Sequence, residues 1–254
     1  MDIPTNTFKR AIAKGEKQIG LWSSTGSIAA VEMLGHAGYD WLLLDTEHTP
    51  TELPDIISQM RVLVGCSAEP IVRPAWNDTV LIKRFLDAGA QSLLIPFVQN
   101  EEEAERAVRA MRYPPHGVRG VSVSSRANRY GRVTDYFKKV HDELCCLVQL
   151  ETGAALERLE AIAAVNGIDG IFIGPSDLSA DLGHLGNPGH PDVQAAIRSA
   201  VDRCRKLGKP AGILAPVEAD ARRYLEWGYT FVAVGADMGL LRKAADELIS
   251  RFRE

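Results

Sequence analysis

Short apolar runs alternate with amphipathic stretches along most of the chain. In five places an amphipathic stretch ends at a glycine, three residues follow, and an apolar run begins; these glycines are Gly38, Gly89, Gly167, Gly208 and Gly228. Glycine at the end of a helix favours a left-handed C-cap, and a short continuous apolar run is typical of a strand buried on both faces of a parallel sheet. The pattern therefore predicts repeated βα units.

The same pattern, followed along the whole chain, predicts eight strands and eight helices. The strands are expected near 19–23, 41–45, 70–73, 92–96, 145–150, 170–174, 211–215 and 231–235. The helices are expected near 26–37, 52–64, 78–88, 101–112, 153–164, 192–207, 217–228 and 238–252. Eight βα units in about 250 residues predict a single-domain (β/α)₈ (TIM) barrel over 1–254. An open doubly wound sheet is the alternative, but it normally has fewer strands, and no glycine-rich phosphate-binding motif is present.

Composition narrows the class of protein. The 254 residues are 46% hydrophobic and 24% charged, with a formal net charge of −4, so a basic nucleic-acid-binding surface is not expected. The N-terminal stretch has no apolar signal segment, and no run is long enough to span a bilayer. The four cysteines form no C-x-x-C pair and are expected to be apolar fillers. We expect a soluble, cytoplasmic protein that binds neither nucleic acid nor membrane.

Polar side chains gather where the predicted strands end. In a barrel of this class the chemistry is built at the carboxyl ends of the strands. The candidates at these positions are Asp45, His48, Arg73, Gln149, Glu151, Ser176 and Asp177. Each one alone has an ordinary explanation, as a helix N-cap, a first-turn acid or a surface residue. Their convergence on one rim favours a functional site, because burying so many polar groups otherwise costs free energy.

The residue types at this rim point to enolate chemistry. Glu151 and Asp177 are hard oxygen ligands suited to Mg²⁺ or Mn²⁺, and two carboxylates leave room for a chelating 2-oxo acid. Arg73 can face a carboxylate or an enolate oxygen. His48, oriented by Asp45, can move protons near neutral pH. We therefore expect a site that forms and stabilises an enolate.

Other positions at the strand ends exclude related mechanisms. The turn at Gly174 and Ser176 presents backbone N–H groups that can hold an anion. No lysine follows a predicted strand, which disfavours a Schiff-base aldolase. Asp237, after the eighth strand, disfavours the phosphate site of a sugar-phosphate isomerase. The remaining histidines are expected to be structural or solvated: His36, His116, His141, His184 and His190.

Six runs of this sequence resemble the HpcH/HpaI aldolases, which are class II, metal-dependent pyruvate aldolases. The runs are WLLLDTEH (41–48), PIVRPAWND (70–78), LLIPFVQN (93–100), RYPPHGVRG (112–120), LVQLET (147–152) and DGIFIGPSDLSADLG (169–183). The resemblance is collinear from Gly20 to Phe252. It implies reversible cleavage of 4-hydroxy-2-oxo acids, such as 4-hydroxy-2-oxoheptanedioate or 2-keto-3-deoxy sugar acids, to pyruvate and an aldehyde such as succinic semialdehyde.

The resemblance also implies a role for each matching residue. Glu151 and Asp177 would bind the metal, with Co²⁺ a further candidate beside Mg²⁺ and Mn²⁺. Arg73 would bind the keto oxygen, and His48, paired with Asp45, would be the acid/base. The residues implied to contact substrate are Gln149, Trp22, Gly174 and the backbone N–H groups of Ser176 and Asp177. The family is further expected to form a homohexamer, a trimer of dimers, in which neighbours exchange the last helix.

The sequence departs from the family pattern at three segments that the resemblance would place near the aldehyde. These are 23–25, 215–217 and the loop 122–132. Arg126 or Arg129 could meet an acidic aldehyde, and an interface or solvated role for these arginines is equally consistent with the sequence.

Two other functions stay open at this point. A lyase acting on CoA thioesters would need a cationic groove, for which Arg119 and the arginines at 126–132 are the only candidates. A non-catalytic protein that binds metal or keto acid is the other, and the complete set of strand-end groups argues against it.

Overall fold

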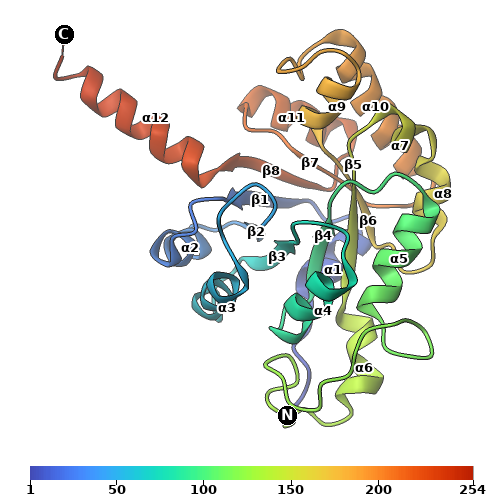
Figure 1. Ribbon diagram of the computed structural model, residues 1–254. Coiled ribbons are helices and arrows are strands. Elements are labelled where there is room, and N and C mark those ends of the chain that lie inside the picture. The colour runs from blue at the N-terminus through green and yellow to red at the C-terminus, as the bar shows by residue number, and fades with distance from the viewer. Residues whose placement is uncertain (254) are drawn as a thin grey trace.

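A computed structural model describes residues 1–253. Eight parallel strands close into a barrel in the order β1 to β8, with helices between successive strands (Figure 1). The strands are β1 (Gln18–Ser23), β2 (Trp41–Asp45), β3 (Glu69–Arg73), β4 (Ser92–Ile95), β5 (Cys145–Leu150), β6 (Gly170–Ile173), β7 (Ala211–Leu214) and β8 (Phe231–Ala236). The predicted (β/α)₈ barrel is confirmed.

Most helices follow the strands at the predicted places. They are α1 (Thr7–Ala13), α2 (Ile28–Gly35), α3 (Leu53–Val62), α4 (Thr79–Asp87), α5 (Glu101–Met111), α6 (Tyr136–Glu143), α7 (Gly153–Glu157), α8 (Leu159–Ala164), α9 (Pro175–Asp181), α10 (Pro191–Lys206), α11 (Glu218–Trp227) and α12 (Asp237–Ser250). The glycines that marked the βα repeat adopt the expected left-handed conformation, with φ from 65° to 111°. Sequence and backbone thus agree on where β2, β4, β6, β7 and β8 begin.

Three short helices and one break were not predicted. Helices α1, α6 and α9 have seven or eight residues each, so they offer about two turns of periodic signal. The single helix expected over 153–164 is divided at Arg158 into α7 and α8. Two turns of amphipathic pattern cannot be told from a loop, and these elements lie inside or beside long connections.

The interior of the barrel is closed at its N-terminal end by α1. Phe8 of this helix packs its ring 6.0 Å from that of Trp41 and 5.6 Å from that of Phe231. Strand glycines make room for these two rings: a Cβ on Gly20 would lie 2.1 Å from Trp41, and one on Gly212 would lie 2.1 Å from Phe231. Aromatic side chains therefore fill the barrel at the N-terminal end of its strands, and the polar site lies at the opposite, C-terminal rim.

Helix α12 leaves the barrel, as Figure 1 shows at the C-terminal end of the chain. It is anchored by the buried Asp237 at its first position, and its apolar residues Leu240, Leu241, Leu248 and Ile249 are exposed. In the predicted hexamer with exchanged last helices, a second subunit would cover these side chains. That arrangement stays a prediction. Within residues 1–253, none of the helices combines the length and apolar character needed to cross a bilayer.

Candidate active site

The predicted site residues lie at the carboxyl ends of neighbouring parallel strands. β2 ends at Asp45 and β3 ends at Arg73, and the register places these two residues directly opposite each other. Glu151 follows β5, and Asp177 is the third residue of α9, which follows β6. Because all eight strands are parallel and the sheet is closed, these side chains share one rim.

Arg73 is fixed by two carboxylates and one aromatic ring. Its Nε and Nη2 donate to the two oxygens of Asp45 at 2.9 and 2.7 Å. Its Nη1 lies 2.7 Å from Oε2 of Glu47, and its Cζ lies 4.9 Å from the centre of the Trp22 ring. The residue is only 5% exposed. A planar cation held from three sides presents a fixed positive charge at the rim.

Asp45 is committed to Arg73 and does not contact His48. Trp22 Nε1 donates to Asp45 Oδ2 at 3.3 Å, and the backbone N–H of Glu47 donates to Oδ1 at 3.0 Å. Burial alone would raise the pKa of Asp45, but hydrogen bonds and the charge of Arg73 outweigh it and lower this pKa. His48 is exposed and has its Nε2 3.9 Å from Glu47 Oε2. The direct pairing of His48 with Asp45 that the resemblance implies is therefore not seen among the described residues.

Glu47 is the residue to which the sequence assigned no role. Its Oε2 contacts Arg73 Nη1 without an aligned hydrogen bond. Burial raises the pKa of Glu47, and the charges of Arg73 and His48 oppose that rise only in part. Glu47 lies two residues beyond Asp45, in a bend where its backbone N–H donates to Asp45 Oδ1 and both carboxylates contact Arg73. That spacing was the signal that could have identified it.

Glu151 and Gln149 form the other half of the site. Gln149 Nε2 donates to Glu151 Oε2 at 2.7 Å, and the backbone N–H of Phe97 donates to Oε1 at 2.9 Å. Burial, and after it the negative charge of Asp177, raise the pKa of Glu151 to about 7. The Oε1 atom of Gln149 is buried and has no hydrogen-bond partner among the described residues. Two carboxylates and one free amide oxygen thus converge here.

This donor set fits a divalent cation. Burial, and after it the charge of Asp177, raise the pKa of Glu151 and so disfavour its ionised form, and a cation held by the two carboxylates would offset both effects. Carboxylate and amide oxygens are the ligands that Mg²⁺ and Mn²⁺ prefer. Asp177 is exposed, so the site is open to solvent on one side. The residues present therefore match the metal expected from the sequence, and the ligand assignment stays a prediction.

The first turn of α9 offers backbone donors beside these carboxylates. Pro175 occupies the first helical position, where the lack of an N–H has no cost. The N–H groups of Ser176 and Asp177 follow, and residues this early in a helix have no intrahelical acceptor. Both residues are exposed at the rim. Their predicted contact with a substrate carboxylate is sterically open.

Gly174 leaves the space that the side chains of Glu151 and Gln149 occupy. A Cβ at this position would lie 2.5 Å from Glu151 Oε2 and 2.9 Å from Gln149 Nε2. We expect Gly174→Ala to displace Glu151 and to weaken affinity for Mn²⁺ at least tenfold, which isothermal titration measures. Gly153→Ala is the matched control, because its Cβ meets neighbours only at 3.5 Å. Equal Mn²⁺ affinity in the two variants would contradict this account.

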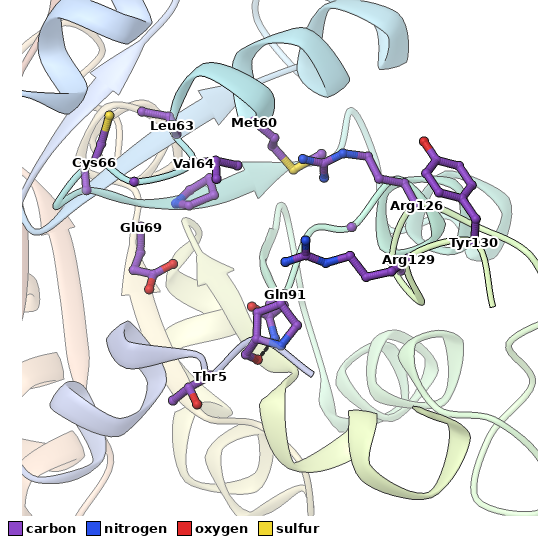
Figure 2. A pocket seen from close by; sticks show the side chains of 16 residues that line it. Thr5, Met60, Leu63, Val64, Cys66, Glu69, Gln91, Arg126, Arg129 and Tyr130 are labelled. Carbon is purple, nitrogen blue, oxygen red and sulfur yellow. Dashed lines mark hydrogen bonds between the residues drawn. The ribbon is translucent and has the colours of Figure 1, made fainter. Parts of the chain in front are cut away.

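The loop 122–132, called the arginine loop below, lies at the end of the barrel opposite the rim that holds Arg73 and Glu151. Arg126 and Arg129 line a cavity of about 410 Å³ together with Glu69 and Gln91, which lie where β3 and β4 begin (Figure 2). Arg126 also donates from Nη1 to the carbonyl oxygen of Ala88 at 2.8 Å. Within one chain these arginines therefore lie away from the rim, whereas the sequence left both contact with the aldehyde and an interface or solvated role open.

Asp237 has a structural role that the sequence did not show. Its carboxylate accepts hydrogen bonds from the hydroxyl groups of Ser23 and Thr25 at 3.1 and 2.7 Å, and from the backbone N–H groups of Ser24 and Thr25. The residue is 6% exposed. Asp237 therefore ties the loop after β1 to the start of α12, and the serine and threonine residues of that loop are engaged with it.

Comparisons with known proteins agree on one family. A family described as HpcH/HpaI aldolase/citrate lyase matches residues 18–244. A pyruvate aldolase of Rhizobium etli is 53% identical over 252 residues, covering 99% of both chains. A 5-keto-4-deoxy-D-glucarate aldolase of Escherichia coli is also 53% identical, covering 100% of this chain and 99% of that one. The crystal structure of a family protein from Burkholderia cenocepacia has a TM-score of 0.95 at 39% identity, covering 98% of this chain and 100% of that one.

Proposed function

Because this chain belongs to the HpcH/HpaI aldolase/citrate lyase family, we propose that it is a metal-dependent pyruvate aldolase that reversibly cleaves 4-hydroxy-2-oxo acids. The observation that carries the proposal is the pair Glu151 and Asp177 at the rim that also holds the clamped Arg73. Such a rim offers two metal ligands and a fixed cation to a substrate that bears a carboxylate and a neighbouring keto group.

Retro-aldol cleavage makes two demands on the site. When the C3–C4 bond breaks, its electron pair stays with C3 and is delocalised as the enolate of pyruvate. The C4 hydroxyl loses its proton and C4 becomes the aldehyde carbon. A divalent metal held by Glu151 and Asp177 would supply Lewis-acid stabilisation of the enolate charge. Protonation at C3 then gives pyruvate, so atoms and charges balance.

Arg73 meets the first of these demands. Nε and Nη2 are engaged by Asp45, whereas Nη1 has only the misaligned contact with Glu47. Nη1 is therefore the donor that is available to a substrate oxygen. Asp45 positions the guanidinium and need not touch the substrate. A donor fixed before the reaction stabilises developing charge without reorganisation.

His48 meets the second demand through its position at the open side of the rim. Its imidazole is exposed beside Glu47, where it can accept the hydroxyl proton directly or through water. We expect His48→Gln to lower kcat by about 10²–10⁴-fold with a smaller change in KM, because general-base catalysis typically contributes that factor. Steady-state kinetics from pH 6 to 9 measures it. His116→Gln, at an exposed histidine of another loop, is the control, and unchanged kcat in His48→Gln would contradict the role.

The relatives narrow the substrate class. A 5-keto-4-deoxy-D-glucarate, numbered from its other end, is a 4-hydroxy-2-oxo diacid, and its cleavage gives pyruvate and a hydroxylated acidic aldehyde. The 53% identity to an enzyme named for this compound supports sugar-derived acids over 4-hydroxy-2-oxoheptanedioate as the substrate. Both compounds are 4-hydroxy-2-oxo acids, so the residues proposed to bind the part that becomes pyruvate do not distinguish them.

The test of the proposal is pyruvate release from a 4-hydroxy-2-oxo acid, coupled to lactate dehydrogenase. We expect release to stop with EDTA and to return with Mg²⁺ or Mn²⁺. We further expect 5-keto-4-deoxy-D-glucarate to give a higher kcat/KM than 4-hydroxy-2-oxoheptanedioate. Release that is insensitive to EDTA would overturn the metal mechanism, and no release in either direction would overturn the aldolase.

The thioester alternative finds no support in the structure. Arg119 is 1% exposed, donates to Asp87 at 2.7 Å and lies over the ring of Tyr113. Arg126 and Arg129 lie at the N-terminal end of the barrel. Three of the arginines that could have bound the phosphates of CoA, Arg119, Arg126 and Arg129, are therefore not at the rim. A CoA thioester included in the same assay is expected to show no turnover.

A further inference from the structure

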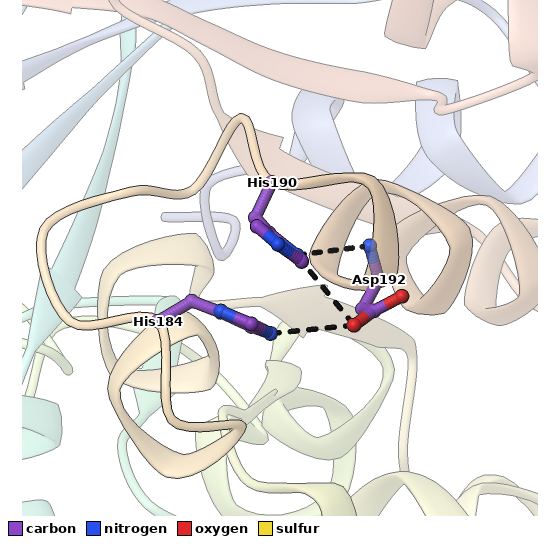
Figure 3. Close-up of side chains that lie close together, drawn as sticks. All are labelled: His184, His190 and Asp192. Atoms are coloured by element: carbon purple, nitrogen blue, oxygen red, sulfur yellow. Dashed lines mark hydrogen bonds and ion pairs between the residues drawn. The ribbon is translucent and has the colours of Figure 1, made fainter.

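Two histidines and one aspartate gather in the segment that joins α9 to α10. His184 and His190 point their rings toward the side chain of Asp192, as Figure 3 shows. His184 Nε2 lies 3.4 Å from Asp192 Oδ2, and His190 Nδ1 lies 3.6 Å from the same oxygen. One nitrogen or oxygen from each of the three side chains lies within 4.8 Å of the other two. The rings are stacked, with centroids 3.5 Å apart.

These separations match the edges of a tetrahedral metal site. With metal–ligand bonds of about 2.1 Å, neighbouring ligand atoms in a tetrahedron are about 3.4 Å apart. The two nitrogen–oxygen separations of 3.4 and 3.6 Å already have this length. The stacked imidazoles must tilt apart so that both lone pairs meet at one point. Both rings are partly exposed, so this tilt meets little packing resistance.

The backbone of this segment holds the three side chains in place. Consecutive turns link His184 to Asn187 and Asn187 to His190, with N–O distances of 2.9 and 3.0 Å. Gln194 of α10 donates from Nε2 to the carbonyl oxygen of Pro188 at 2.8 Å. His190 is the N-cap of α10, and the N–H of Asp192 donates to His190 Nδ1 at 3.3 Å. That hydrogen bond is long, so a metal ion can take the Nδ1 lone pair at small cost.

The chemistry of the cluster differs from that of the rim. Two imidazoles and one carboxylate suit borderline metals such as Zn²⁺, Co²⁺ and Ni²⁺, whereas Mg²⁺ prefers oxygen ligands alone. Neither histidine belongs to the proposed aldolase site, whose metal ligands are Glu151 and Asp177. A metal here would join the loop after α9 to the start of α10, and it would not contact substrate.

We propose that His184, His190 and Asp192 form a second metal site, which binds a zinc-class divalent cation with water completing its coordination. Binding clamps the loop between α9 and α10 and stabilises the folded chain, since a ligand that binds only the native state raises its stability. The proposal does not rest on the aldolase function, and it would stand if the protein cleaved no keto acid.

The test uses the full-length, tag-free chain carrying Glu151→Gln, which weakens the rim site. Titration with Co²⁺ is followed by visible absorption and by calorimetry, in the presence of excess Mg²⁺. We expect one Co²⁺ per chain with the absorption of a nitrogen-containing, low-coordinate site. We also expect an increase in melting temperature with Zn²⁺. His184→Ala added to this background is expected to lower Co²⁺ affinity at least tenfold, and His116→Ala is expected to leave it unchanged.

A second variant guards against a folding defect. Asp192→Asn keeps the size and the polar contacts of the side chain at an exposed position, and it is also expected to weaken Co²⁺ binding. Equal Co²⁺ affinity in the Glu151→Gln chain with and without the changes at 184 and 192 would overturn the proposal. Displacement of the bound Co²⁺ by Mg²⁺ would overturn it as well, because the signal would then belong to oxygen ligands.

Discussion

Replacing Arg73 with lysine is expected to lower kcat for retro-aldol cleavage by about 10²–10³-fold, the usual effect of removing one preorganised donor from an oxyanion site. Lysine keeps the charge but cannot donate to both oxygens of Asp45 while also lying over the ring of Trp22. The ammonium would then be free to move, and the positive charge would no longer be fixed where enolate charge develops. Pyruvate release at saturating Mn²⁺ measures the effect.

Two further variants separate charge from position. Asp45→Asn leaves Arg73 in place but loosens one side of its clamp, so we expect a smaller loss of kcat, of about tenfold. Arg222→Lys changes an exposed arginine that pairs with Glu218 on the outer helix α11, and it should leave kcat unchanged. If Arg73→Lys retained full kcat, a fixed guanidinium would not be part of the mechanism.

The fold could be predicted because its signals are local and repeated. Five of the strands are preceded by a glycine at a helix end, and each unit has its own apolar strand, so errors in one unit do not affect the next. The missed helices α1, α6 and α9 lack this repetition, and their place is decided by tertiary contacts. Phe8 of α1, for example, is held by Trp41 and Phe231, which are distant in sequence.

The sequence predicted which residues lie at the rim, but it did not predict which of them contact one another. Strand ends placed Asp45, Arg73 and Glu151 at one rim, because topology alone fixes that position. The partner of Asp45 depends on the β2–β3 register, which sets Asp45 opposite Arg73. His48, three residues further along the chain, has already left the strand. Sequence proximity therefore favoured His48 as the partner of Asp45, and the two-residue spacing from Asp45 was the signal for the contact of Glu47 with Arg73.

The arginine loop shows the same limit over a longer distance. Arg126 and Arg129 lie in a connection of about thirty residues, and sequence gives no direction for such a segment. The structure carries it to the end of the barrel where Glu69 and Gln91 lie. The sequence showed that this loop is positively charged, but only the fold shows at which end of the barrel that charge lies.

Glu151→Gln is expected to stabilise the metal-free protein. When metal is added, the variant is expected to gain less stability than the unsubstituted protein, so the order of the two reverses. The pKa of Glu151 is about 7 in the fold, against an ordinary value of 4.5. Between these values the folded state binds more protons than the unfolded state, so this group's contribution to stability falls as pH rises. Above pH 7 the metal-free protein carries the full cost of the buried charge, which is up to about 3 kcal/mol at about 1.4 kcal/mol per pKa unit. Glutamine removes that cost.

Without metal at pH 8, the Glu151→Gln variant should therefore melt several degrees above the unsubstituted protein, and the difference should vanish near pH 4.5. Adding Mn²⁺ at pH 8 should raise the melting temperature of the unsubstituted protein far more than that of the variant, because only the carboxylate binds the cation strongly. Loss of the metal's Lewis-acid contribution, several kcal/mol, should lower kcat by about 10³-fold. Glu157→Gln, at an exposed position of α7, is the control and should change neither quantity. A variant that melts below the unsubstituted protein without metal at pH 8 would show that Glu151 is not a destabilised carboxylate held ready for a cation.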